Sequence, residues 1–599
     1  MHIQRSQVIR GATLLIALLF IVRLFCIQVL SQEYVLAAEK NIVQPVIEHP
    51  VRGMIYDRHG TLLTHNAPVY DLMVTPSAIR HLDKEAFCRD FSLTRQQLDQ
   101  GLQKARSYSY VKPSILIKSI SLSTWARVQD NMEAYAGFFV KVRTTRHHPH
   151  SMLANTLGYM GEIGPDQLAS DRSHYYRQGD WVGVSGLEQY YEAVLRGQRG
   201  MRYDITNARG VYQGKFKRGK LDQPSVPGQP LTTTIDAPLQ AYGEVLMQHK
   251  LGSIVAIEPT TGEVLAMISS PTYDPNQLVG SMLGKRFASL GKETDAPLFH
   301  RPIMAMYSPG SIFKLVQVLI ALQEQAIKPS TRYACRKSPF NCREHPSPLN
   351  LQQALQHSCN SYLYQVFKRI INQQASDSVY EDTRIGLERW HHYMQGLGLG
   401  ISLGIDLPGE KRGFIPNAAF YDRCHGVGRW HVSTVRSLAI GQGELMVTPL
   451  QMANLMAVMA NRGYYYTPHL VKQVGKEVTG RDLVHRHSVD IAPEHFDFVA
   501  RSMREVVEKG SAWRARIKGI SVCAKTGTVE NLHGHDHSVC VAFAPQDNPQ
   551  IAIAVYVENA GWGARAAASI AGLMVEQYLR GKITRPWIQA YVQKGNFFH

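Results

Sequence analysis

Three short motifs contain residue types that together could transfer an acyl group. They occur along the chain in the order Ser311-Ile312-Phe313-Lys314, Ser358-Cys359-Asn360 and Lys525-Thr526-Gly527-Thr528. A serine hydroxyl is a poor nucleophile until a base removes its proton, and a partly desolvated lysine amine can act as that base. Each motif alone is too short to be specific, whereas the ordered triple is a strong signal. The sequence therefore predicts a serine acyl-transfer site.

The first motif is predicted to open a helix. It follows Ser308-Pro309-Gly310 and begins an apolar-periodic run over residues 311–325. A spacing of three places Lys314 on the same helical face as Ser311, so the amine can approach the hydroxyl. Read in isolation, so short a tetrapeptide indicates a helix N-cap followed by a solvated lysine, and only its spacing to the other two motifs favours the catalytic interpretation.

The second motif is predicted to assist the nucleophile. Ser358 and Asn360 lie in a polar break between two helical patterns, residues 351–356 and 362–371. Alternate residues of such a loop can point the same way, with the middle residue pointing elsewhere. We expect Ser358 to relay a proton and Asn360 to hold a substrate amide.

The third motif is predicted to bind substrate. It ends a strand-like run over residues 520–524, and Gly527 would let a substrate backbone lie close against that edge. Lys525, Thr526 and Thr528 suit a carboxylate or a carbonyl group. These residues complete the predicted site.

Several further segments resemble the class B penicillin-binding proteins, which are serine peptidoglycan D,D-transpeptidases, and most of all their elongation-specific penicillin-binding protein 2 members. Each segment is weak singly, but together with the three motifs their order is specific and covers nearly the whole chain. The segments are Arg52-Gly53, Asp57-Arg58-His59-Gly60, Gly183-Val184-Ser185-Gly186-Leu187-Glu188, Gly404-Ile405-Asp406-Leu407-Pro408-Gly409, Gly441-Gln442-Gly443-Glu444 and Val557-Glu558-Asn559-Ala560-Gly561-Trp562-Gly563.

This resemblance implies a mechanism. Ser311 would attack the D-alanyl-D-alanine carbonyl of a donor stem peptide with Lys314 as its base, D-alanine would leave, and the amine of a neighbouring stem peptide would resolve the acyl-enzyme. β-Lactams would acylate the same serine. The oxyanion would lie between the backbone N–H groups of Ser311 and Thr528, at about 3 kcal/mol per donor. The residues do not decide which group deprotonates Ser311.

A membrane anchor is predicted at the N-terminus. Residues 11–30 form the only long apolar stretch, and about 20 such residues span a bilayer. Arg5 and Arg10 precede the stretch, which favours a cytoplasmic N-terminus with the rest of the chain on the other side of the membrane. The resemblance implies that this membrane is a bacterial inner membrane and that the catalytic part is periplasmic. The alternative is a signal peptide cleaved near Val35-Leu36-Ala37.

The predicted domains are residues 1–35 (tail and anchor, span about 11–30), 36–230 (an elongated mixed α and β pedestal, which the resemblance implies) and 231–599 (transpeptidase domain). The fold class is α+β. Five antiparallel strands are expected at residues 252–258, 263–269, 520–524, 539–543 and 551–557, with a closing helix at 565–579 and a helical lobe between the strand groups.

The chain's formal net charge of +17 does not indicate nucleic-acid binding, because no basic cluster with interleaved aromatics occurs. Anionic wall polymer and lipid headgroups fit better. No glycosyltransferase-like domain is recognisable, so the resemblance implies a membrane glycan polymerase and rod-complex scaffold proteins as partners. The alternative functions are a β-lactam sensor and a catalytically silent scaffold of the cell-wall complex.

No cofactor is expected for catalysis, but Cys335, Cys342, His345 and Cys359 could complete a structural zinc shell. Cys359 is the middle residue of the second motif and would face away from substrate, so a metal behind it could fix the loop. The alternatives are a disulfide between two of the cysteines or buried thiols. Another histidine group, His533, His535 and His537, is expected to be a polar loop at the cleft mouth.

Overall fold

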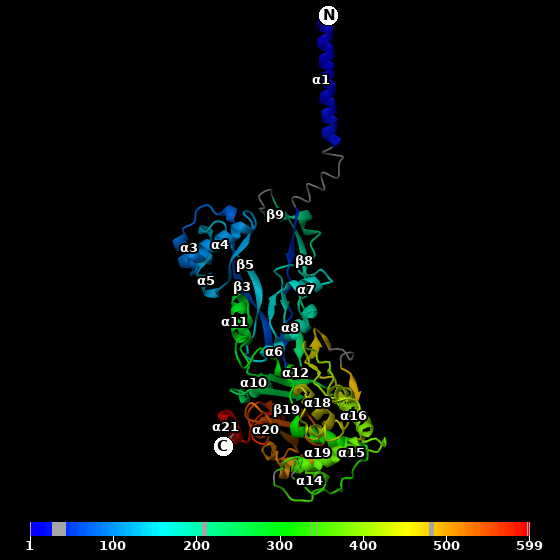
Figure 1. Ribbon diagram of the computed structural model, residues 1–599. Coiled ribbons are helices and arrows are strands. Elements are labelled where there is room, and N and C mark those ends of the chain that lie inside the picture. Colours follow the sequence, from blue (N-terminus) through cyan, green and yellow to red (C-terminus); the bar gives the residue numbers. More distant parts are fainter. Residues whose placement is uncertain are drawn as a thin grey trace. The chain divides into compact units, whose positions relative to one another are not determined.

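The computed structural model describes residues 2–26, 43–206, 212–336, 338–342, 344–478, 484–595 and 597 (Figure 1). The chain forms two compact units. Unit 1 contains residues 1–53, 67–145 and 196–228, and unit 2 contains residues 54–66, 146–195 and 229–599. Because the units interleave along the chain, they divide it differently from the predicted boundaries at 35/36 and 230/231, which stay predictions.

Unit 1 begins with the apolar helix α1 (His2–Phe25), in which Gln7–Phe25 is long and apolar enough to cross a membrane. The predicted span ran to residue 30; residues 27–30 and the alternative cleavage segment lie outside the described residues. The helix also starts earlier than expected, because the polar residues before the apolar stretch continue it.

Two small β-structures form the rest of unit 1. One is an antiparallel sheet in the order β1 (Val43–Glu48), β8 (Gly200–Thr206), β9 (Tyr212–Lys215). The other pairs β4 (Ser114–Ile120) and β5 (Phe138–His147) with the second half of β3 (Leu62–Val74). The remaining elements are η2 (Pro76–Ala78), α3 (Lys84–Asp90), α4 (Arg95–Tyr108), α5 (Leu122–Val128), η3 (Gln129–Ala134) and η4 (Phe216–Gly219).

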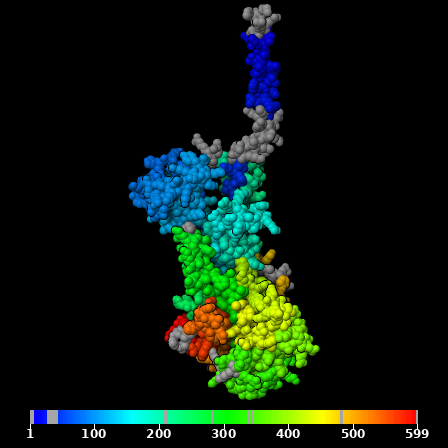
Figure 2. Space-filling model, in the orientation of Figure 1, coloured from blue at the N-terminus to red at the C-terminus, as the bar shows by residue number. Residues whose placement is uncertain are grey.

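Helices α3 and α4 pack on this second structure through a core that includes Phe87, Leu98 and Leu102. Residues 67–145 form the blue cluster in Figure 2. Between these two helices the chain turns at Ser92 (φ 55°), and α4 starts anew from the Thr94 capping box. A positive φ interrupts helical hydrogen bonding, and the new cap stabilises a second helix.

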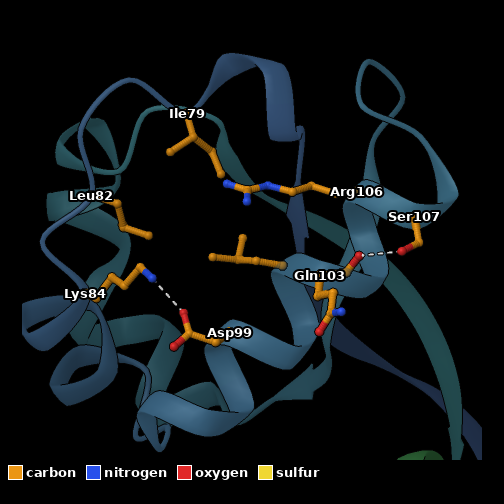
Figure 3. Close-up of a pocket in the computed structure, with 8 residues that line it drawn as sticks. Ile79, Leu82, Lys84, Asp99, Gln103, Arg106 and Ser107 are labelled. Carbon is orange, nitrogen blue, oxygen red and sulfur yellow. Dashed lines mark hydrogen bonds and ion pairs between the residues drawn. The ribbon is translucent and has the colours of Figure 1, made fainter.

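A cavity of about 570 Å³ lies in this part of unit 1 (Figure 3). Its wall carries an ion pair between Lys84 Nζ and Asp99 Oδ1 at 2.7 Å, together with the Arg106 side chain. The residues lining it include no cysteine or histidine, and its one hydroxyl, on Ser107, donates to the Gln103 carbonyl. It therefore lacks the combination of groups predicted for acyl transfer.

Unit 2 is built on a five-stranded antiparallel sheet in the order β12-β11-β19-β18-β17, which confirms the predicted sheet. The turn Pro259–Gly262 joins strands β11 and β12. Strand β17 is an edge strand. The strands are β11 (Gly252–Ile257), β12 (Val264–Ser270), β17 (Cys523–Val529), β18 (His537–Ala544) and β19 (Ile551–Val557).

Each face of this sheet has its own core. One face packs against the helical lobe and contributes Val255, Val541 and Cys523 to the larger core. The other packs under α10 (Ala237–Leu246), α20 (Ala566–Arg580) and α21 (Pro586–Lys594) and contributes Ile254, Ala524 and Ala542. The period-2 alternation of a strand explains this division. Two cores therefore hold the sheet, and β17 in particular, from both sides.

The helical lobe supplies the elements that carry the first two motifs. Its main members are η7 (Gly310–Phe313), α13 (Lys314–Gln323), α14 (Leu351–Gln356), α15 (Asn360–Ile371), α16 (Val379–Gly396), α17 (Ala418–His425), η8 (Arg436–Ile440), α18 (Pro449–Ala460) and α19 (Pro493–Lys509). Helix α14 has the predicted bounds. Helix α13 is fully buried along most of its length, as its nearly continuous apolar sequence requires.

The other elements of unit 2 lie around these layers. They are β2 (Ile55–Tyr56), the first half of β3, α6 (Ala154–Leu157), β6 (Met160–Glu162), α7 (Pro165–Ser170), β7 (Trp181–Gly183), α8 (Gly186–Tyr190), α9 (Glu192–Leu195), β10 (Leu231–Thr233), η5 (Pro275–Leu278), η6 (Gly280–Met282), α11 (Leu283–Leu290), α12 (Arg301–Met304), β13 (Tyr464–Tyr466), β14 (Val471–Val474), β15 (Glu477–Val478), β16 (Arg486–Ser488) and η9 (Trp513–Ala515).

Candidate active site

The nucleophile motif begins as a 3-10 helix. Ser311 lies in η7, and the α-helix starts only at Lys314, whereas the sequence predicted one helix over 311–325. Gly310 N donates to the Gly441 carbonyl at 2.8 Å. A Cβ at Gly441 would lie 2.2 Å from Gly310 O, so only glycine fits where the Gly441-Gln442-Gly443-Glu444 segment supports η7. The tight turn places Ser311, which is half-buried, just before the start of α13.

The first two motifs meet through the Lys314 amine, which is completely buried. Its Nζ donates to Ser358 O at 2.7 Å, to Ser358 Oγ at 3.1 Å and to Asn360 Oδ1 at 2.5 Å. Within the described ranges, Ser311 Oγ has no hydrogen-bond partner. We expected the Lys314 amine to approach the Ser311 hydroxyl, but the two are not hydrogen-bonded. Lys314 is held by the second motif, one helical turn behind the nucleophile.

The third motif joins the same network through Lys525, which is also completely buried. Its Nζ donates to Ser358 Oγ at 3.0 Å and to the Thr526 carbonyl at 2.9 Å. Ser358 Oγ thus lies between two lysine amines. Ser358 has a φ of 58°, a conformation that costs a non-glycine residue free energy and that persists only when its surroundings hold it. The loop that carries Ser358 is therefore fixed by both lysines.

Burial changes the protonation of both lysines. It lowers the pKa of Lys314 to about 8. It also lowers the pKa of Lys525 well below the usual range, and the neighbouring Lys314 charge lowers it further. Removing an ammonium group from water disfavours its charged form, and two adjacent ammonium groups repel each other. The site can therefore hold a neutral amine near neutral pH, as a base for Ser311 requires.

Strand β17 carries the third motif along the sheet edge. The strand-like run was predicted to end at residue 524, which is wrong: β17 spans Cys523–Val529, and the motif is its centre. The motif's polar residues hid the strand from a hydropathy pattern. Gly527 lies against η7, since a Cβ there would be 3.4 Å from Ser311 N. The nucleophile and the edge that could bind a peptide are therefore adjacent.

The two threonines of the motif point to the face of β17 opposite Lys525, as strand alternation requires. Thr526 Oγ1 lies 2.6 Å from Ser511 Oγ, and Thr528 Oγ1 accepts from Gly563 N at 3.3 Å. A Cβ at Gly563 would lie 2.1 Å from Gly527 O, so this glycine permits the close approach of the two backbones. The Thr526 hydroxyl is committed to Ser511, so this residue lines the edge mainly through its backbone.

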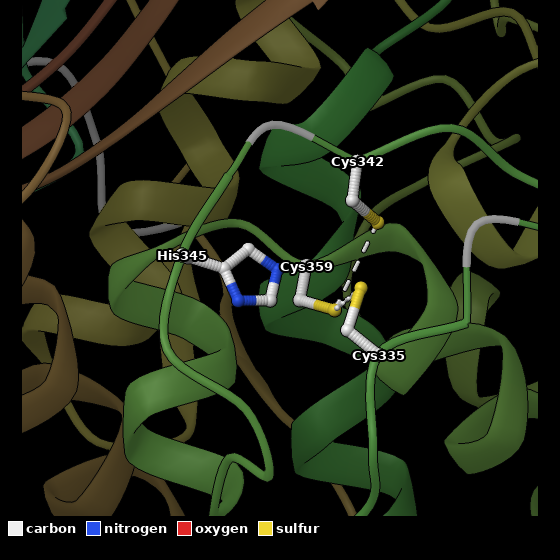
Figure 4. Close-up of side chains that lie close together, drawn as sticks. All are labelled: Cys335, Cys342, His345 and Cys359. Carbon is white, nitrogen blue, oxygen red and sulfur yellow. Dashed lines mark hydrogen bonds between the residues drawn. The ribbon is translucent and has the colours of Figure 1, made fainter.

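The predicted metal ligands come together behind the second motif (Figure 4). The ligand atoms of Cys335, Cys342, His345 and Cys359, here called the Cys3His cluster, all lie within 4.8 Å of one another. Cys359 Sγ is 3.6 Å from Cys335 Sγ and 3.9 Å from Cys342 Sγ. His345 Nδ1 lies 2.8 Å from Pro346 O, whereas Nε2 is buried with no hydrogen-bond partner in the described structure.

Two sulfurs of this cluster cap helix α15. Cys359 Sγ accepts from Tyr362 N at 3.4 Å, and Cys342 Sγ accepts from Ser361 N at 3.4 Å. The neighbouring Asn341 carbonyl accepts from Asn360 Nδ2 at 3.0 Å. The cluster and its neighbour Asn341 therefore contact the three residues that follow Cys359.

Sequence reasoning missed three contributors to this site. Ser511 and Gly563 contact β17, and Asn341 holds the Asn360 amide. Gly563 was within a segment noted only for its family resemblance, while a lone serine or asparagine carries no local signal. The histidines His533 and His535 lie in the turn between β17 and β18, as expected, and His537 begins β18, where its Nδ1 accepts from Asn559 N at 3.0 Å.

Two family models match the chain. The penicillin binding protein transpeptidase domain matches residues 252–576, and the penicillin-binding protein dimerisation domain matches residues 47–233. The first match alone covers more than half of the chain. The protein therefore belongs to the penicillin-binding protein transpeptidase family.

Within that family, the chain is similar to peptidoglycan D,D-transpeptidases called MrdA. It is 27% identical to the Acinetobacter baumannii protein over 89% of this chain and 81% of that protein, and 27% identical to the Escherichia coli K12 protein over 94% and 92%. The similarity extends through both matched domains, which supports the resemblance to elongation-specific penicillin-binding protein 2.

Solved structures show the same fold. A penicillin-binding protein 2 in complex with MreC from Helicobacter pylori matches with a TM-score of 0.73 at 23% identity over 90% of this chain and 100% of that chain. A chain of a peptidoglycan synthase complex that coordinates polymerization and crosslinking matches with a TM-score of 0.71 at 26% identity, over 97% and 99%. Pseudomonas aeruginosa penicillin-binding protein 2 matches with a TM-score of 0.66 at 25% identity, over 91% and 99%.

Proposed function

We propose that this protein is a peptidoglycan D,D-transpeptidase of the elongation type, with Ser311 as its nucleophile. The observation that carries the proposal is the convergence of all three motifs on Ser358, whose hydroxyl lies between Lys314 Nζ and Lys525 Nζ beside the edge strand β17. Family membership and the MrdA relatives support the reaction class. The arrangement suits a substrate with a peptide backbone and a C-terminal carboxylate.

In the acylation step, Ser311 Oγ attacks the carbonyl carbon of the penultimate D-alanine of a donor stem peptide. Lys314 Nζ takes the hydroxyl proton, because burial favours its neutral amine. The C–N bond breaks, and the leaving D-alanine nitrogen receives a proton relayed through Ser358, which Lys314 and Lys525 both contact. The product is a Ser311 ester of the stem peptide plus free D-alanine.

In the second step, an amine of a neighbouring stem peptide attacks this ester. The new peptide bond forms, the Ser311–acyl bond breaks, and the proton lost by the attacking amine returns to Ser311 Oγ. The donor backbone would lie against β17 at Gly527, with Lys525 toward its carboxylate, the Thr528 backbone N–H toward its carbonyl oxygen and Asn360 toward its amide. A β-lactam presents a strained amide to the same serine and would stop at the acyl-enzyme.

Turnover tests this proposal. The full-length protein in detergent, supplied with lipid-linked glycan strands bearing pentapeptides, should release D-alanine and form cross-linked dimers detected by mass spectrometry. The Ser311→Ala variant should form none. Penicillin binding without dimer formation by the wild type would instead favour a sensor, and neither activity would favour a silent scaffold.

We also propose that the Cys3His cluster holds one structural zinc ion. Tetrahedral Zn–S bonds of about 2.3 Å place sulfurs about 3.8 Å apart, close to the two observed separations. The contact of His345 Nδ1 with Pro346 O would fix the tautomer that leaves Nε2 as a ligand. Four protein ligands would close the shell, so the ion would support the loop without taking part in acyl transfer. Elemental analysis of the purified protein tests this, with about one zinc per chain expected and none contradicting it.

The membrane arrangement and the partners are part of the same proposal. Helix α1 would anchor the chain in the inner membrane with Arg5 and Arg10 in the cytoplasm and unit 2 in the periplasm. Two similar structures, one of a complex with MreC and one of a peptidoglycan synthase complex, support a scaffold and a glycan polymerase as partners. Protease accessibility in spheroplasts and co-purification after cross-linking in cells test these two points. Protection of unit 2, or recovery of neither partner, would contradict them.

A further inference from the structure

The three thiols of the Cys3His cluster are close enough to react with one another. Cys359 Sγ lies 3.9 Å from Cys342 Sγ, and a disulfide bond is about 2.05 Å long (Figure 4). A movement of less than about 2 Å would therefore join them. A bound zinc ion would hold the sulfurs apart as separate ligands, and its loss would remove that restraint.

The exposures of these thiols differ in a way that suits stepwise oxidation. Cys342 is partly exposed, whereas Cys359 is 1% exposed. An oxidant arriving from solvent therefore meets Cys342 or the likewise partly exposed Cys335 before Cys359, which is the nearby buried thiol that can resolve the product. Cys342 is the one of the two whose neighbour, Asn341, contacts the catalytic loop. This pairing of an accessible and a resolving thiol is absent at Cys424, which is exposed and far along the chain from the cluster.

A Cys342–Cys359 bond would act on the catalytic loop directly. Cys359 separates Ser358 from Asn360, and Asn341, the neighbour of Cys342, accepts the Asn360 Nδ2 hydrogen bond at 3.0 Å. Asn360 Oδ1 in turn accepts from Lys314 Nζ. Drawing the two sulfurs together would move Asn341 and Asn360, and with them the contact between Asn360 and Lys314.

Ser358 makes the loop sensitive to such a shift. Its φ of 58° is unfavourable for serine and depends on the contacts around it. When Cys359 moves, the backbone of Ser358 must follow, and the hydrogen bonds from Lys314 and Lys525 to Ser358 Oγ lengthen. Acylation of Ser311 would then lose its proton relay while the rest of unit 2 stays folded.

We propose that Cys342 and Cys359 form a reversible oxidation site whose disulfide slows acylation of Ser311. The oxidant is a protein or small-molecule disulfide. The Cys342 thiolate attacks one of its sulfurs, forming a mixed disulfide and releasing one thiol. The Cys359 thiolate then attacks the Cys342 sulfur and releases the second thiol. Two cysteines are oxidised, one external disulfide is reduced to two thiols, and any zinc leaves as the ion.

The test uses full-length protein in detergent with three independent readouts. The protein is treated with a zinc chelator and oxidised glutathione, and then examined for released zinc, for a Cys342–Cys359-linked peptide by non-reducing mass spectrometry, and for the rate of labelling by a fluorescent penicillin. We expect the linked peptide and labelling at least about tenfold slower, the size typical of lost support behind a site. Dithiothreitol with zinc should restore the rate.

Two variants separate the mechanism from general oxidation. Cys342→Ser should give no linked peptide and no oxidant-dependent slowing, whereas Cys424→Ser should respond as the wild type does. If Cys342→Ser does not fold, the proposal is tested on the wild type alone, by whether labelling slows on oxidation and recovers on reduction with zinc. Failure to form the linked peptide overturns the proposal, and so does a linked peptide with unchanged labelling.

The effect on acylation rests on the proposed function, but the disulfide does not. If reduced wild-type protein takes up no penicillin, the transpeptidase assignment fails, and the linked peptide alone then decides whether the oxidation site exists. The two failures are therefore distinguishable.

Discussion

Two groups of side chains meet at residues 358–360 and are built on different principles. On one side, Lys314 and Lys525 converge on Ser358 through hydrogen bonds from fully buried amines. On the other, the Cys3His cluster gathers around Cys359. The loop alternates, so consecutive residues serve the reacting side and the supporting side. This comparison indicates that the chemistry depends on buried amines, and that its geometry depends on the side chains behind Cys359.

Removing the buried amine should have the largest effect. Lys314→Met keeps the length and apolar stem of the side chain but deletes the base and three hydrogen bonds. General-base loss predicts penicillin acylation about 10³-fold slower, measured by stopped-time labelling. Lys292→Met, at an exposed lysine, is the matched control and should change nothing. A rate within tenfold of the wild type for Lys314→Met would show that another group activates Ser311.

Removing the shared hydroxyl should have the next effect. Ser358→Ala leaves Lys314 its bonds to the Ser358 carbonyl and to Asn360 but breaks the link to Lys525. Loss of a proton relay predicts acylation about 10²-fold slower. Ser289→Ala on an exposed helix serves as the control. If Ser358→Ala acylates normally, the bridge between the lysines is structural and the relay must be assigned elsewhere.

A change on the supporting side should be smaller and of a different kind. Cys359→Ser keeps an acceptor for Tyr362 N but removes one sulfur from the cluster. We expect loss of bound zinc and acylation about tenfold slower, since residues that orient a site typically contribute that much. Zinc content and labelling are measured together, with Cys424→Ser as control. Equal zinc content in Cys359→Ser and wild type would contradict the assigned ligand set.

The two groups also differ in how far the sequence predicted them. The Cys3His cluster was predicted complete, because four ligand-type residues within 25 positions carry a chemical signal that needs no packing. The three catalytic motifs were also predicted from their residue types and order. The contacts among them were not predicted, because Lys314 Nζ donates a hydrogen bond to Ser358, 44 positions away, and none to Ser311.

The bounds of helices and strands were likewise predicted where a local sequence pattern marks them and missed where it does not. Helix α14 and strand β19 have the predicted bounds, since apolar pattern and turn residues agree there. Strand β17 was predicted to end where its polar catalytic residues begin, because hydropathy cannot recognise an edge strand that lines a polar site. The contact between Ser511 and Thr526 joins a loop to this strand and left no pattern in the sequence.

That contact gives the smallest predicted effect. Ser511→Ala removes the 2.6 Å partner of Thr526 Oγ1 on the face of β17 away from the lysines. A net hydrogen bond contributes about 1 kcal/mol, so we expect acylation about fivefold slower if the strand edge shifts. The labelling rate is compared with that of Ser289→Ala. A decrease in acylation rate as large as that of Ser358→Ala would show that Ser511 acts with the reacting groups and does not merely support β17.

The central claim is that Ser311 forms the acyl-enzyme. Full-length wild-type and Ser311→Ala proteins are incubated with a fluorescent penicillin, and the covalent adduct is located by gel and peptide mass. We predict a stable label on the peptide that contains Ser311 and no label in the variant. Folded wild-type protein that takes up no label, or a label on another residue that persists in Ser311→Ala, would contradict the account.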